Sequence, residues 1–359
     1  MNIQFTSSNG VYFYQTKMGG SVMKERLIIP EGYKSSLNIK ETEIAIKRVK
    51  DFFETELSKA LSVTRVSAPL FLSPETGMND NLNGVERPVS FDIKDMDGQK
   101  VEIVHSLAKW KRMALGRYGF AVGEGLYTDM DAIRRDEELD NIHSIYVDQW
   151  DWEKIIAKND RKESKLKEIV ESIYGVFKST EEHVEKLYPE LKATLPDKIT
   201  FITSQELEDL YPDLTSKERE NAIAKKYGAV FIMKIGGVLK SGERHDGRAP
   251  DYDDWELNGD ILFWYPTLDM ALELSSMGIR VDEDTLEKQL KLSKCEDRRT
   301  LDYHRLVLEK KLPYTVGGGI GQSRICMFFL QKAHIGEVQA SIWPNEMINV
   351  CEEHNMLLL

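Results

Sequence analysis

The segment Tyr146-Val-Asp-Gln-Trp-Asp-Trp-Glu153 alternates polar with aromatic residues and says more about the fold than any other stretch of the chain. Successive side chains of a β-strand point to opposite faces, so Gln149, Asp151 and Glu153 are expected to share one face. The two tryptophans point the other way together with Asp148, and other elements have to cover them. The segment therefore predicts a strand with one packed face and one face of hydrogen-bonding groups. The alternative is an edge strand whose acidic face lies in water.

Helices and strands alternate on both sides of this segment. Residues 43–61 carry apolar side chains at spacings of three and four, which predicts an amphipathic helix, and the charged stretch 162–187 predicts a second long helix. Further helices are predicted at 106–115, from Ser204 onward, and at 215–226, 283–293, 298–311 and 322–333. Further strands are predicted at 63–70, 89–93, 101–104, 200–203, 230–235, 261–265 and 273–281. This pattern indicates an α+β protein, a mixed sheet with helices on its faces.

The bulk composition excludes several classes of protein. The chain has 359 residues, of which 41% are hydrophobic and 30% are charged, so it can bury a large core. It contains no run of 18 or more apolar residues, and we expect no membrane span. The net charge of -12 argues against a broad nucleic-acid surface. The three cysteines are scattered, which suits a reducing cytosol and supplies neither a disulfide framework nor a zinc site.

The domain organisation is expected to be simple. Residues 1–22 are rich in Gly, Ser and Asn and lack the basic and apolar regions of a signal peptide, so we expect a poorly ordered extension. Residues 23–359 contain no internal repeat, low-complexity tract or long linker. They are therefore expected to form a single domain.

The predicted strand that ends at Arg280 has a second set of polar side chains. In regular alternation Glu273 and Ser275 share one face. Ser276 and Arg280 share the other, unless a bulge at Gly278 brings the arginine round to the side of Glu273. A buried acid and a buried arginine on adjacent strands would suit a ligand with both cationic and anionic groups. A structural salt bridge is the alternative.

A glycine run, Gly317-Gly-Gly-Ile-Gly-Gln-Ser-Arg324, is expected to form a turn that leads into a helix. Such a turn can bind phosphate through backbone N–H groups. The run nevertheless lacks the Lys-Ser/Thr of a P-loop and the spacing of a dinucleotide-binding fingerprint. Arg324 falls in the first turn of the helix, where the helix dipole disfavours a cation. A ligand such as adenine or phosphate would explain this placement.

Lys111 lies on the same face of its predicted helix as Leu107 and Leu115, whereas Lys109 lies off that face. A lysine on an apolar stripe usually extends its ammonium to water. In this position it could instead contact a substrate carboxylate.

The stretch from Arg244 to Trp255 is the densest cluster of charges in the chain. Its acids at 251, 253 and 254 suggest calcium, but an EF-hand loop also needs Gly at its sixth position and Glu at its twelfth, and both are absent. We expect a mobile loop on the nucleotide side of a site rather than a metal cage. His143 and His245 show no metal spacing and are expected to be structural.

Three features together resemble motifs 1, 2 and 3 of class II aminoacyl-tRNA synthetases. These are the helix 43–61 with a strand that ends at Pro69, the sequence Arg134-Arg-Asp-Glu137 before the polar strand, and the glycines before Arg324. Several short segments of the sequence are similar to the AMP-forming aspartate–ammonia ligases, relatives of aspartyl-tRNA synthetase without its tRNA-binding modules. The resemblance runs from about Met23 to the end of the chain and is carried by residues 79–82, 105–112, 123–127, 146–153, 248–255, 257–260, 273–280 and 317–324.

The resemblance implies a fold, a reaction and an environment. The fold would be a mostly antiparallel mixed sheet flanked by helices, in a cytoplasmic homodimer that binds neither nucleic acid nor membranes. The reaction would make L-asparagine from L-aspartate, ammonia and ATP through a β-aspartyl-adenylate, with Mg²⁺ as cofactor and AMP and pyrophosphate as products. Positioning and electrostatic stabilisation would dominate catalysis, because charge develops on phosphate in both steps.

It also implies roles for the residues around aspartate. Lys111 and Arg280 would bind the α-carboxylate, the guanidinium through two parallel hydrogen bonds. Asp80 and Asp151 would bind the ammonium group and later orient ammonia. Ser106 would be a further contact of the aspartate.

On the nucleotide, Arg134 would stabilise the α-phosphate in the transition state, and Gln149 would bond substrate or phosphate. Arg324 would stack on adenine. Glu273, with Asp260 near it, would hold Mg²⁺ between the phosphates. Further nucleotide contacts would come from Arg248, Asp253, Ser275 and Ser276.

Three alternatives are less consistent with the sequence. An aminoacyl-tRNA synthetase would need a tRNA-binding module of about 100 residues, for which the matched motifs leave no room. A glutamine-dependent asparagine synthetase would use an N-terminal cysteine, whereas Asn2 follows Met1 and Lys24 follows Met23. A paralogue that binds an amino acid without catalysis would be expected to have lost charged residues of the site, and all of them are present.

Overall fold

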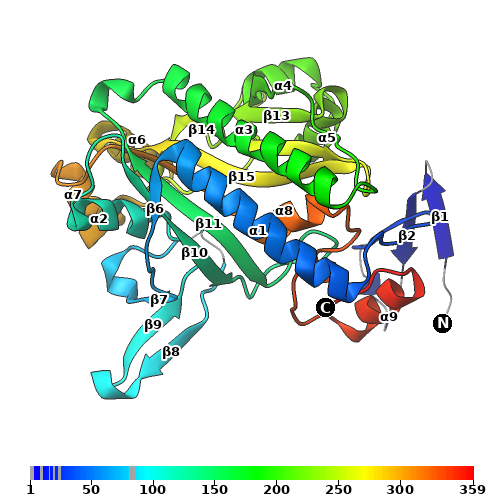
Figure 1. The fold of residues 1–359 in the computed structure, drawn as a ribbon. Helices are drawn as coiled ribbons and strands as arrows, with labels where there is room; N and C mark the ends of the chain where they lie inside the picture. Colours follow the sequence, from blue (N-terminus) through cyan, green and yellow to red (C-terminus); the bar gives the residue numbers. More distant parts are fainter. Residues whose placement is uncertain are drawn as a thin grey trace.

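The computed structural model describes residues 4–8, 11–15, 17–18, 21–22, 26–80, 82 and 86–359. It confirms an α+β architecture built on an eight-stranded sheet (Figure 1). In spatial order the strands are β12 (Thr200–Thr203), β13 (Ala229–Met233), β14 (Asp253–Tyr265), β15 (Met270–Arg280), β16 (Thr315–Gly321), β11 (Tyr146–Ile155), β10 (Gly125–Ile133) and β6 (Val63–Arg65). The outermost pair at each end of the sheet is parallel, and the central pairs are antiparallel.

Helices cover both faces of this sheet. Along the chain they are α1 (Ile39–Leu61), α2 (Ala108–Tyr118), α3 (Glu163–Leu187), α4 (Ser204–Leu210), α5 (Ser216–Tyr227), α6 (Glu283–Leu292), α7 (Asp302–Leu308), α8 (Gln322–Phe329) and α9 (Asn345–Glu353). The two long helices α1 and α3 run side by side across one face (Figure 1). Capping boxes fix the starts of α1, α4 and α5, with Asn38, Thr203 and Thr215 as N-caps. Within the described ranges no helix is both long and apolar enough to cross a bilayer.

Smaller sheets lie beside the main one. One contains β7 (Phe71–Leu72), β9 (Gln99–Ile103) and β8 (Ser90–Ile93), and projects from the body in Figure 1. Near the N-terminus β2 (Val11–Gln15) pairs with β1 (Gln4–Ser8) on one side and with β5 (Ile28–Pro30) on the other, and β3 (Lys17–Met18) pairs with β4 (Ser21–Val22). The expected poor order of residues 1–22 falls partly outside the described residues and stays a prediction.

The main core lies between the sheet and the helices α1, α3 and α8. Trp150 and Trp152 of β11 are fully buried there, and Phe53 of α1 stacks on Trp150 with ring centroids 5.0 Å apart. Large aromatic side chains contribute most per residue to such a core because each removes a large apolar area from water. The alternation in β11 thus has the expected consequence, since its tryptophans are packed and its polar residues face the other side. The edge-strand alternative is wrong, because β11 lies between β16 and β10.

Several expected elements differ from the structure. Gly317–Gly321 forms the end of strand β16 rather than a turn. Strand β10, with Leu126, Met130 and Ala132 alternating toward buried clusters, was missing from the predicted set. The predicted strand 63–70 stops at Arg65, and the predicted helices 298–311 and 322–333 end at Leu308 and Phe329.

Strand β14 begins earlier than its apolar run predicts. It starts at Asp253, inside the charged cluster, because it pairs with β15 as far as Arg280. The register shifts twice along this pair. Residues 254–257 of β14 oppose Ile279 alone, and Leu274 of β15 is an extra residue beside Glu273. The bulge predicted at Gly278 therefore has its extra residues in the partner strand, and a second bulge lies beside Glu273.

Candidate active site

A cavity of about 400 Å³ lies on the polar face of β11. Strands β11, β15 and β16, which are neighbours in the sheet, form its floor. Its walls come from four parts of the chain, which include Asp80 to Lys111, Arg134 to Asp148, Asp246 to Asp253 and Ser323 to Gln339. All the predicted site residues line it except Asp260, whose carboxylate is bound by the wall residue Arg248. The sheet thus brings together residues that lie more than 200 positions apart in the chain.

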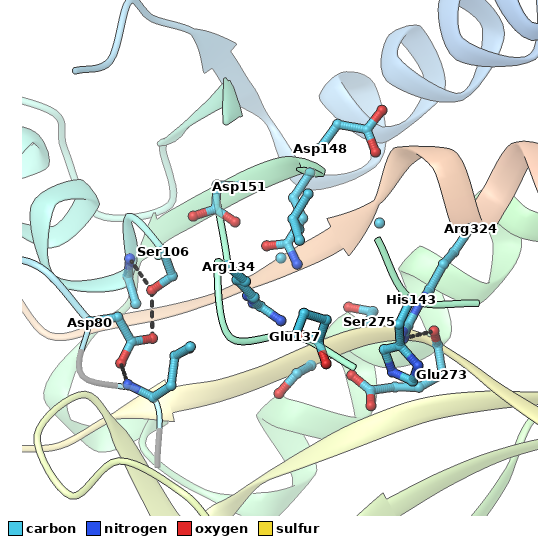
Figure 2. A pocket seen from close by; sticks show the side chains of 18 of the residues that line it. Asp80, Ser106, Arg134, Glu137, His143, Asp148, Asp151, Glu273, Ser275 and Arg324 are labelled. Atoms are coloured by element: carbon cyan, nitrogen blue, oxygen red, sulfur yellow. Dashed lines mark hydrogen bonds between the residues drawn. The ribbon is translucent and has the colours of Figure 1, made fainter. Parts of the chain in front are cut away.

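The cavity has two ends, which we name by one residue each. The Asp80 end is formed by Asp80, Ser106, Lys111, Asp151 and Arg280. The Arg324 end is formed by His143, Arg248, Glu273, Ser275 and Arg324. Figure 2 shows Asp80 and Ser106 on one side of the cavity, Glu273, His143 and Arg324 on the other, and Arg134 between them.

Asp80 is held by hydrogen bonds from separate segments. The Ser106 hydroxyl donates to its Oδ2 over 2.8 Å, and the Tyr252 hydroxyl donates to the same oxygen over 3.1 Å. Its Oδ1 accepts the backbone N–H of Leu82 at 2.9 Å. A carboxylate with several donors is fixed in position before any ligand arrives.

Lys111 and Asp151 form a fully buried ion pair at 3.3 Å. The ammonium also donates to the carbonyl of Gly318 in the floor over 2.9 Å, and Asp151 accepts the N–H of Leu107 over 3.1 Å. Burial lowers the pKa of Lys111, and the neighbouring Asp151 opposes this shift. The alternative in which Lys111 extends to water is therefore wrong, because its side chain is buried against the cavity.

Arg280 is clamped by two carboxylates. Glu153 accepts from its Nε at 3.0 Å and from its Nη2 at 2.7 Å, and Asp253 accepts from its Nη1. Burial opposes the charge of Arg280, but both acids together raise its pKa well above the ordinary value. Burial alone would raise the pKa of Glu153, yet Arg280 holds it below its usual value. Burial keeps the pKa of Asp253 raised in spite of the same arginine.

The glycines of β16 explain how these side chains fit over the floor. A Cβ at Gly317 would overlap the Glu153 carboxylate and lie 2.6 Å from Arg280 Nη2. A Cβ at Gly319 would overlap the Gln149 amide and lie 2.8 Å from Asp151 Oδ1. The glycine run therefore makes room for side chains of the neighbouring strands, and this close approach, rather than the expected turn, accounts for the glycines.

Buried polar atoms without partners lie at the Arg324 end and beside it. Among the described residues no hydrogen-bond acceptor lies within reach of Arg248 Nε, or of Arg134 Nε between the two ends. The Ser275 hydroxyl is also buried and unpartnered, as is Oδ1 of Asp260, whose carboxylate is bound by Arg248 outside the cavity lining. A buried polar group without a partner costs free energy, on the order of 1–3 kcal/mol. The atoms of Arg134, Arg248 and Ser275, which line the cavity, indicate where a polar ligand would bind.

Asp260 and Glu273 supply acidic groups at this end. The Asp260 Oδ2 accepts from Arg248, while burial, opposed by Arg248 and assisted by Glu273, raises the pKa of Asp260 to about 7. Within the described chain no cluster of three or more His, Cys, Asp or Glu side chains could hold a metal by itself. A metal at these two acids would thus need ligands from a bound substrate.

Arg324 occupies the expected first turn of α8. Its Nη1 donates to the carbonyl of Glu273 over 2.9 Å, which fixes the guanidinium over the Arg324 end. His143 lines the same end, with its Nδ1 2.9 Å from Asp140 Oδ2. His245 is buried against Glu220 and does not line the cavity, which is consistent with the structural role expected for it.

Asp251, in the charged cluster before β14, is held by ion pairs. It pairs with Lys109 at 3.6 Å, with His304 at 3.0 Å and with Arg298 at 2.9 Å. Lys109 is thus also buried, although the helical pattern placed it off the apolar face. These pairs tie Asp251 to α2 and α7.

Two residues of this site were missed from the sequence. Tyr252 lines the cavity, bonds Asp80 and lies 5.7 Å from the Arg280 guanidinium, measured to the ring centroid. Glu153 was placed on the correct face, but its role as the partner of Arg280 was not predicted. Extending the predicted strand back to Asp253 would have set Tyr252 beside Arg280 and so indicated the contact between these two residues.

Comparison with known proteins identifies the family. The family model for aspartate-ammonia ligase matches residues 40–355. The aspartate–ammonia ligase of Ruminiclostridium cellulolyticum is 68% identical over 93% of this chain and 99% of its own. That of Clostridium tetani is 69% identical over 93% and 98% of the two chains, and that of Ligilactobacillus salivarius 62% over 93% and 99%.

Solved structures agree on the fold. The asparaginyl-tRNA synthetase of Pyrococcus horikoshii, complexed with asparaginyl-adenylate, superposes with a TM-score of 0.63 at 13% identity, covering 95% of this chain and 94% of that one. The aspartyl-tRNA synthetase of Entamoeba histolytica gives 0.57 at 15% identity, over 83% and 58% of the two chains. The fold is therefore that of the class II aminoacyl-tRNA synthetases. The match to the family model and the identity to its members show that this chain belongs to the aspartate–ammonia ligase family.

Proposed function

We propose that this aspartate–ammonia ligase makes asparagine in two steps through an enzyme-bound β-aspartyl-adenylate. In the first step a β-carboxylate oxygen of aspartate attacks the α-phosphorus of ATP, and pyrophosphate leaves with the electron pair of the broken P–O bond. In the second step ammonia attacks the acyl carbon, AMP leaves, and the amide nitrogen loses a proton. The observation that carries this proposal is one cavity with paired acids and bases at one end and unpartnered basic N–H groups at the other.

The Asp80 end suits the α-amino and α-carboxylate groups of aspartate. Lys111 and Arg280 carry the positive charges, and Asp80 and Asp151 carry negative charges close to them. A ligand with one ammonium and one carboxylate complements this pattern without leaving a buried charge unpaired. The β-carboxylate then points toward Arg134, which lies between the two ends.

Arg134 is the best-placed group to stabilise the adenylate transition state. It follows β10, its backbone N–H donates to the carbonyl of Ile145 over 2.8 Å, and its buried Nε faces no acceptor among the described residues. A preorganised cation aimed at the α-phosphate acts on charge as it develops. Gln149, on the floor beside Asp151, would bond the phosphate or the acyl oxygen. Arg135, the residue after Arg134, does not line the cavity.

The adenine ring is assigned to Arg324, and the phosphates to the space between it and Arg134. Guanidinium planes stack on aromatic rings, and the bond to the Glu273 carbonyl holds this one in place. Ser275 and Ser276 of β15 offer hydroxyl groups nearby, and Arg248 offers an unpartnered Nε. These groups would take the ribose and the phosphates.

Mg²⁺ fits the acids at the Arg324 end. The free Oδ1 of Asp260 and the carboxylate of Glu273 are oxygen ligands, and Mg²⁺ usually takes one or two protein carboxylates and completes its shell with phosphate oxygens and water. When bound, the ion would neutralise charge on the phosphates. Asp260 and Glu273 would hold it, and Arg248 would orient Asp260.

Ammonia is proposed to bind where the α-amino group of aspartate is already recognised. Asp151 and Asp80 can accept hydrogen bonds from ammonia and direct its lone pair at the acyl carbon. We infer that ammonia rather than glutamine is the nitrogen source, because Asp80 and Asp151 in the cavity can accept hydrogen bonds from it. Activity with glutamine alone would contradict this inference.

We further propose that the chain forms a homodimer in the cytoplasm and binds no tRNA. The long helix α1 carries Ile39 and Ile44 exposed on its outer face, which a second copy could cover. Sedimentation of the purified protein tests the dimer, and a filter-binding assay at low salt tests for tRNA.

The decisive experiment follows one oxygen atom. Aspartate labelled with ¹⁸O in its β-carboxylate is converted with ATP and ammonium, and the products are analysed by mass spectrometry. Attack of the carboxylate on the α-phosphorus transfers one label to AMP. ADP as a product, or label in inorganic phosphate, would refute the adenylate. Arg134→Ala should abolish the label in AMP, with Arg135→Ala as the matched control.

A further inference from the structure

A chain of polar contacts joins helix α1 to the Arg324 end from the far side of the sheet. It begins at Lys50, whose ammonium lies 2.9 Å from Asp148 Oδ2. The side chain of Lys50 is 27% exposed and that of Asp148 only 8%, so this pair is largely withdrawn from water. In Figure 2 the Asp148 carboxylate points away from the cavity centre, where Arg134 lies. This is the face of β11 that α1 and α8 cover.

The other oxygen of Asp148 caps helix α8. Its Oδ1 accepts the backbone N–H of Ser323 at 3.0 Å and the amide of Gln339 at 3.3 Å. The N-cap residue of α8 is Gly321, which has no side chain to do this, and no side-chain cap on it is found in the described chain. A carboxylate at the first turn of a helix satisfies an otherwise free N–H and interacts favourably with the helix dipole.

The capped turn carries Arg324. Ser323 is the residue directly before it, and Gln339 ties the Ser323 hydroxyl to the same network over 2.9 Å. A shift in the first turn of α8 would therefore move the Arg324 guanidinium relative to Glu273, to which it is bonded. A displacement of about 1 Å in a positioning group can cost on the order of a hundredfold in rate.

We propose that Lys50 is a positioning residue for ATP, which acts by keeping the Asp148 carboxylate paired and fixed as the cap of α8. The proposal rests on the function proposed above for Arg324. Without Lys50, Asp148 is a buried carboxylate with neutral donors only, and it is drawn toward water. This change loosens the turn that aims Arg324. The aspartate subsite stands on β11, β15 and α2 and does not depend on this contact.

The lysine retains its charge in this place. Burial works against the charge, but the adjacent Asp148 leaves the pKa of Lys50 raised above its ordinary value. Lys50 therefore stays charged across the pH range in which an enzyme is assayed.

The test uses substitutions at both ends of the pair. Lys50→Met removes the charge and keeps the length of the side chain, and Asp148→Asn keeps the Oδ1 acceptor for Ser323 while removing the charge that Lys50 neutralises. We expect Lys50→Met to raise the KM for ATP about tenfold, the order expected for one unpaired, partly buried charge, and to leave the KM for aspartate within twofold. The double variant should return the KM for ATP to within about threefold of wild type, because no unpaired charge remains.

Controls separate this role from a structural one. Lys47→Met removes a lysine of the same helix whose ion pair with Asp51 is exposed, and it should change neither KM. Lys50→Arg preserves the charge and should preserve the KM for ATP. Thermal unfolding of each variant shows whether it is folded.

The outcomes decide the proposal in each case. If Lys50→Met raises the KM for ATP and the KM for aspartate equally, the positioning role is wrong. It is also wrong if adding Asp148→Asn to Lys50→Met leaves the KM for ATP raised. Calorimetric titration of ATP into the same variants provides a readout without turnover. If the wild-type protein binds ATP but releases no AMP, the proposed reaction is wrong. The ATP affinities of the variants, measured by calorimetry, would still test the role of Lys50.

Discussion

The two ends of the cavity differ in how completely their polar groups are satisfied. At the Asp80 end every charged side chain already has protein partners, so that Asp80, Lys111, Asp151 and Arg280 are fixed by bonds to one another or to neighbours. At the Arg324 end buried atoms of Arg248 and Ser275 find no partner among the residues described, and neither does Nε of Arg134 between the two ends. This difference indicates that the Asp80 end is preorganised for a small zwitterion. The second is completed by its ligand, as expected for a nucleotide with a metal ion.

The largest effect is expected from Gly317→Ala, which breaks the prebuilt end. The added Cβ would overlap the Glu153 carboxylate and crowd Arg280, in a strand hydrogen-bonded on both sides. We expect kcat/KM for aspartate to fall at least a hundredfold and the melting temperature to drop, since overpacking a buried site costs about 1–3 kcal/mol before the ion pair is lost. Steady-state kinetics and thermal unfolding measure both.

Gly321→Ala is the matched control for that change. Its Cβ would have its nearest neighbour 3.4 Å away, at Arg324 Cβ, and the backbone there is ordinary. It should retain aspartate kinetics within about threefold. Equal losses in the two variants would show that any side chain in this run is harmful, regardless of Glu153 and Arg280.

Lys111→Met should give the next largest effect and separate the two substrates. It leaves the Asp151 carboxylate buried and unpaired, which costs about 3–5 kcal/mol, and removes a proposed ligand of the α-carboxylate. We expect the KM for aspartate to rise about a hundredfold and the KM for ATP to stay within threefold.

Lys109→Met provides the comparison on the same helix. Lys109 is equally buried and also paired with an aspartate, Asp251, but it does not line the cavity. Its loss should lower the melting temperature without raising the KM for aspartate by more than about threefold. A similar rise in the KM for aspartate in both variants would mean that the loss of a buried lysine, rather than the loss of a contact with substrate, causes the effect of Lys111→Met.

Arg324→Ala should affect the opposite end with a smaller magnitude. Loss of a cation stacked on adenine removes about 1–2 kcal/mol, so the KM for ATP should rise about five- to thirtyfold while that for aspartate is unchanged. Arg305→Ala, which breaks an exposed pair with Asp302, should change neither. A rise in the KM for aspartate comparable to that for ATP would contradict the division of the cavity into two ends.

The smallest effect is a pH dependence that belongs to the Arg324 end. The pKa of Asp260, raised to about 7 by burial, means that Mg²⁺ must displace a proton from it at pH 6 but hardly at pH 8. Apparent Mg²⁺ affinity in the presence of ATP should therefore rise about tenfold between these pH values. Asp260→Asn should remove the rise, whereas Asp269→Asn, at an exposed acid paired with Lys225, should keep it.

The same carboxyl influences stability without ligands. Its pKa is higher in the folded protein than in the unfolded chain, so the folded state binds more protons between about pH 4 and 7. The contribution of Asp260 to stability is present at low pH and is lost as the pH rises through this window. Melting temperatures of Asp260→Asn should accordingly fall less steeply with pH, and parallel curves would contradict the assignment.

Local pattern predicted the parts of the fold that depend on local geometry. The alternation in β11 placed Trp150 in the core and Gln149 and Asp151 on the cavity, because strand parity requires no knowledge of neighbours. The amphipathic helix α1 followed from spacing in the same way, although its N-cap Asn38 lies before the predicted start.

Features that depend on a partner strand could not be predicted locally. The glycines of β16 suggested a turn, since glycine is unfavourable in strands, and their purpose is visible only in the side chains of Glu153 and Gln149 above them. The start of β14 at Asp253 likewise depends on its pairing with Arg280. The substrate roles came from the resemblance to a family, because charge and spacing alone indicate a polar site without naming its ligand.

The glycine floor also sets the size of the substrate. A residue without a side chain can be replaced only by one that adds atoms, so substitution at Gly317 or Gly319 can make the cavity shallower and never deeper. An amino acid one methylene longer than aspartate could therefore be admitted only by shortening another side chain that lines the cavity, for instance Tyr252 in the wall or Gln149 on β11. Efforts to widen the substrate range of this enzyme should start there and leave β16 untouched.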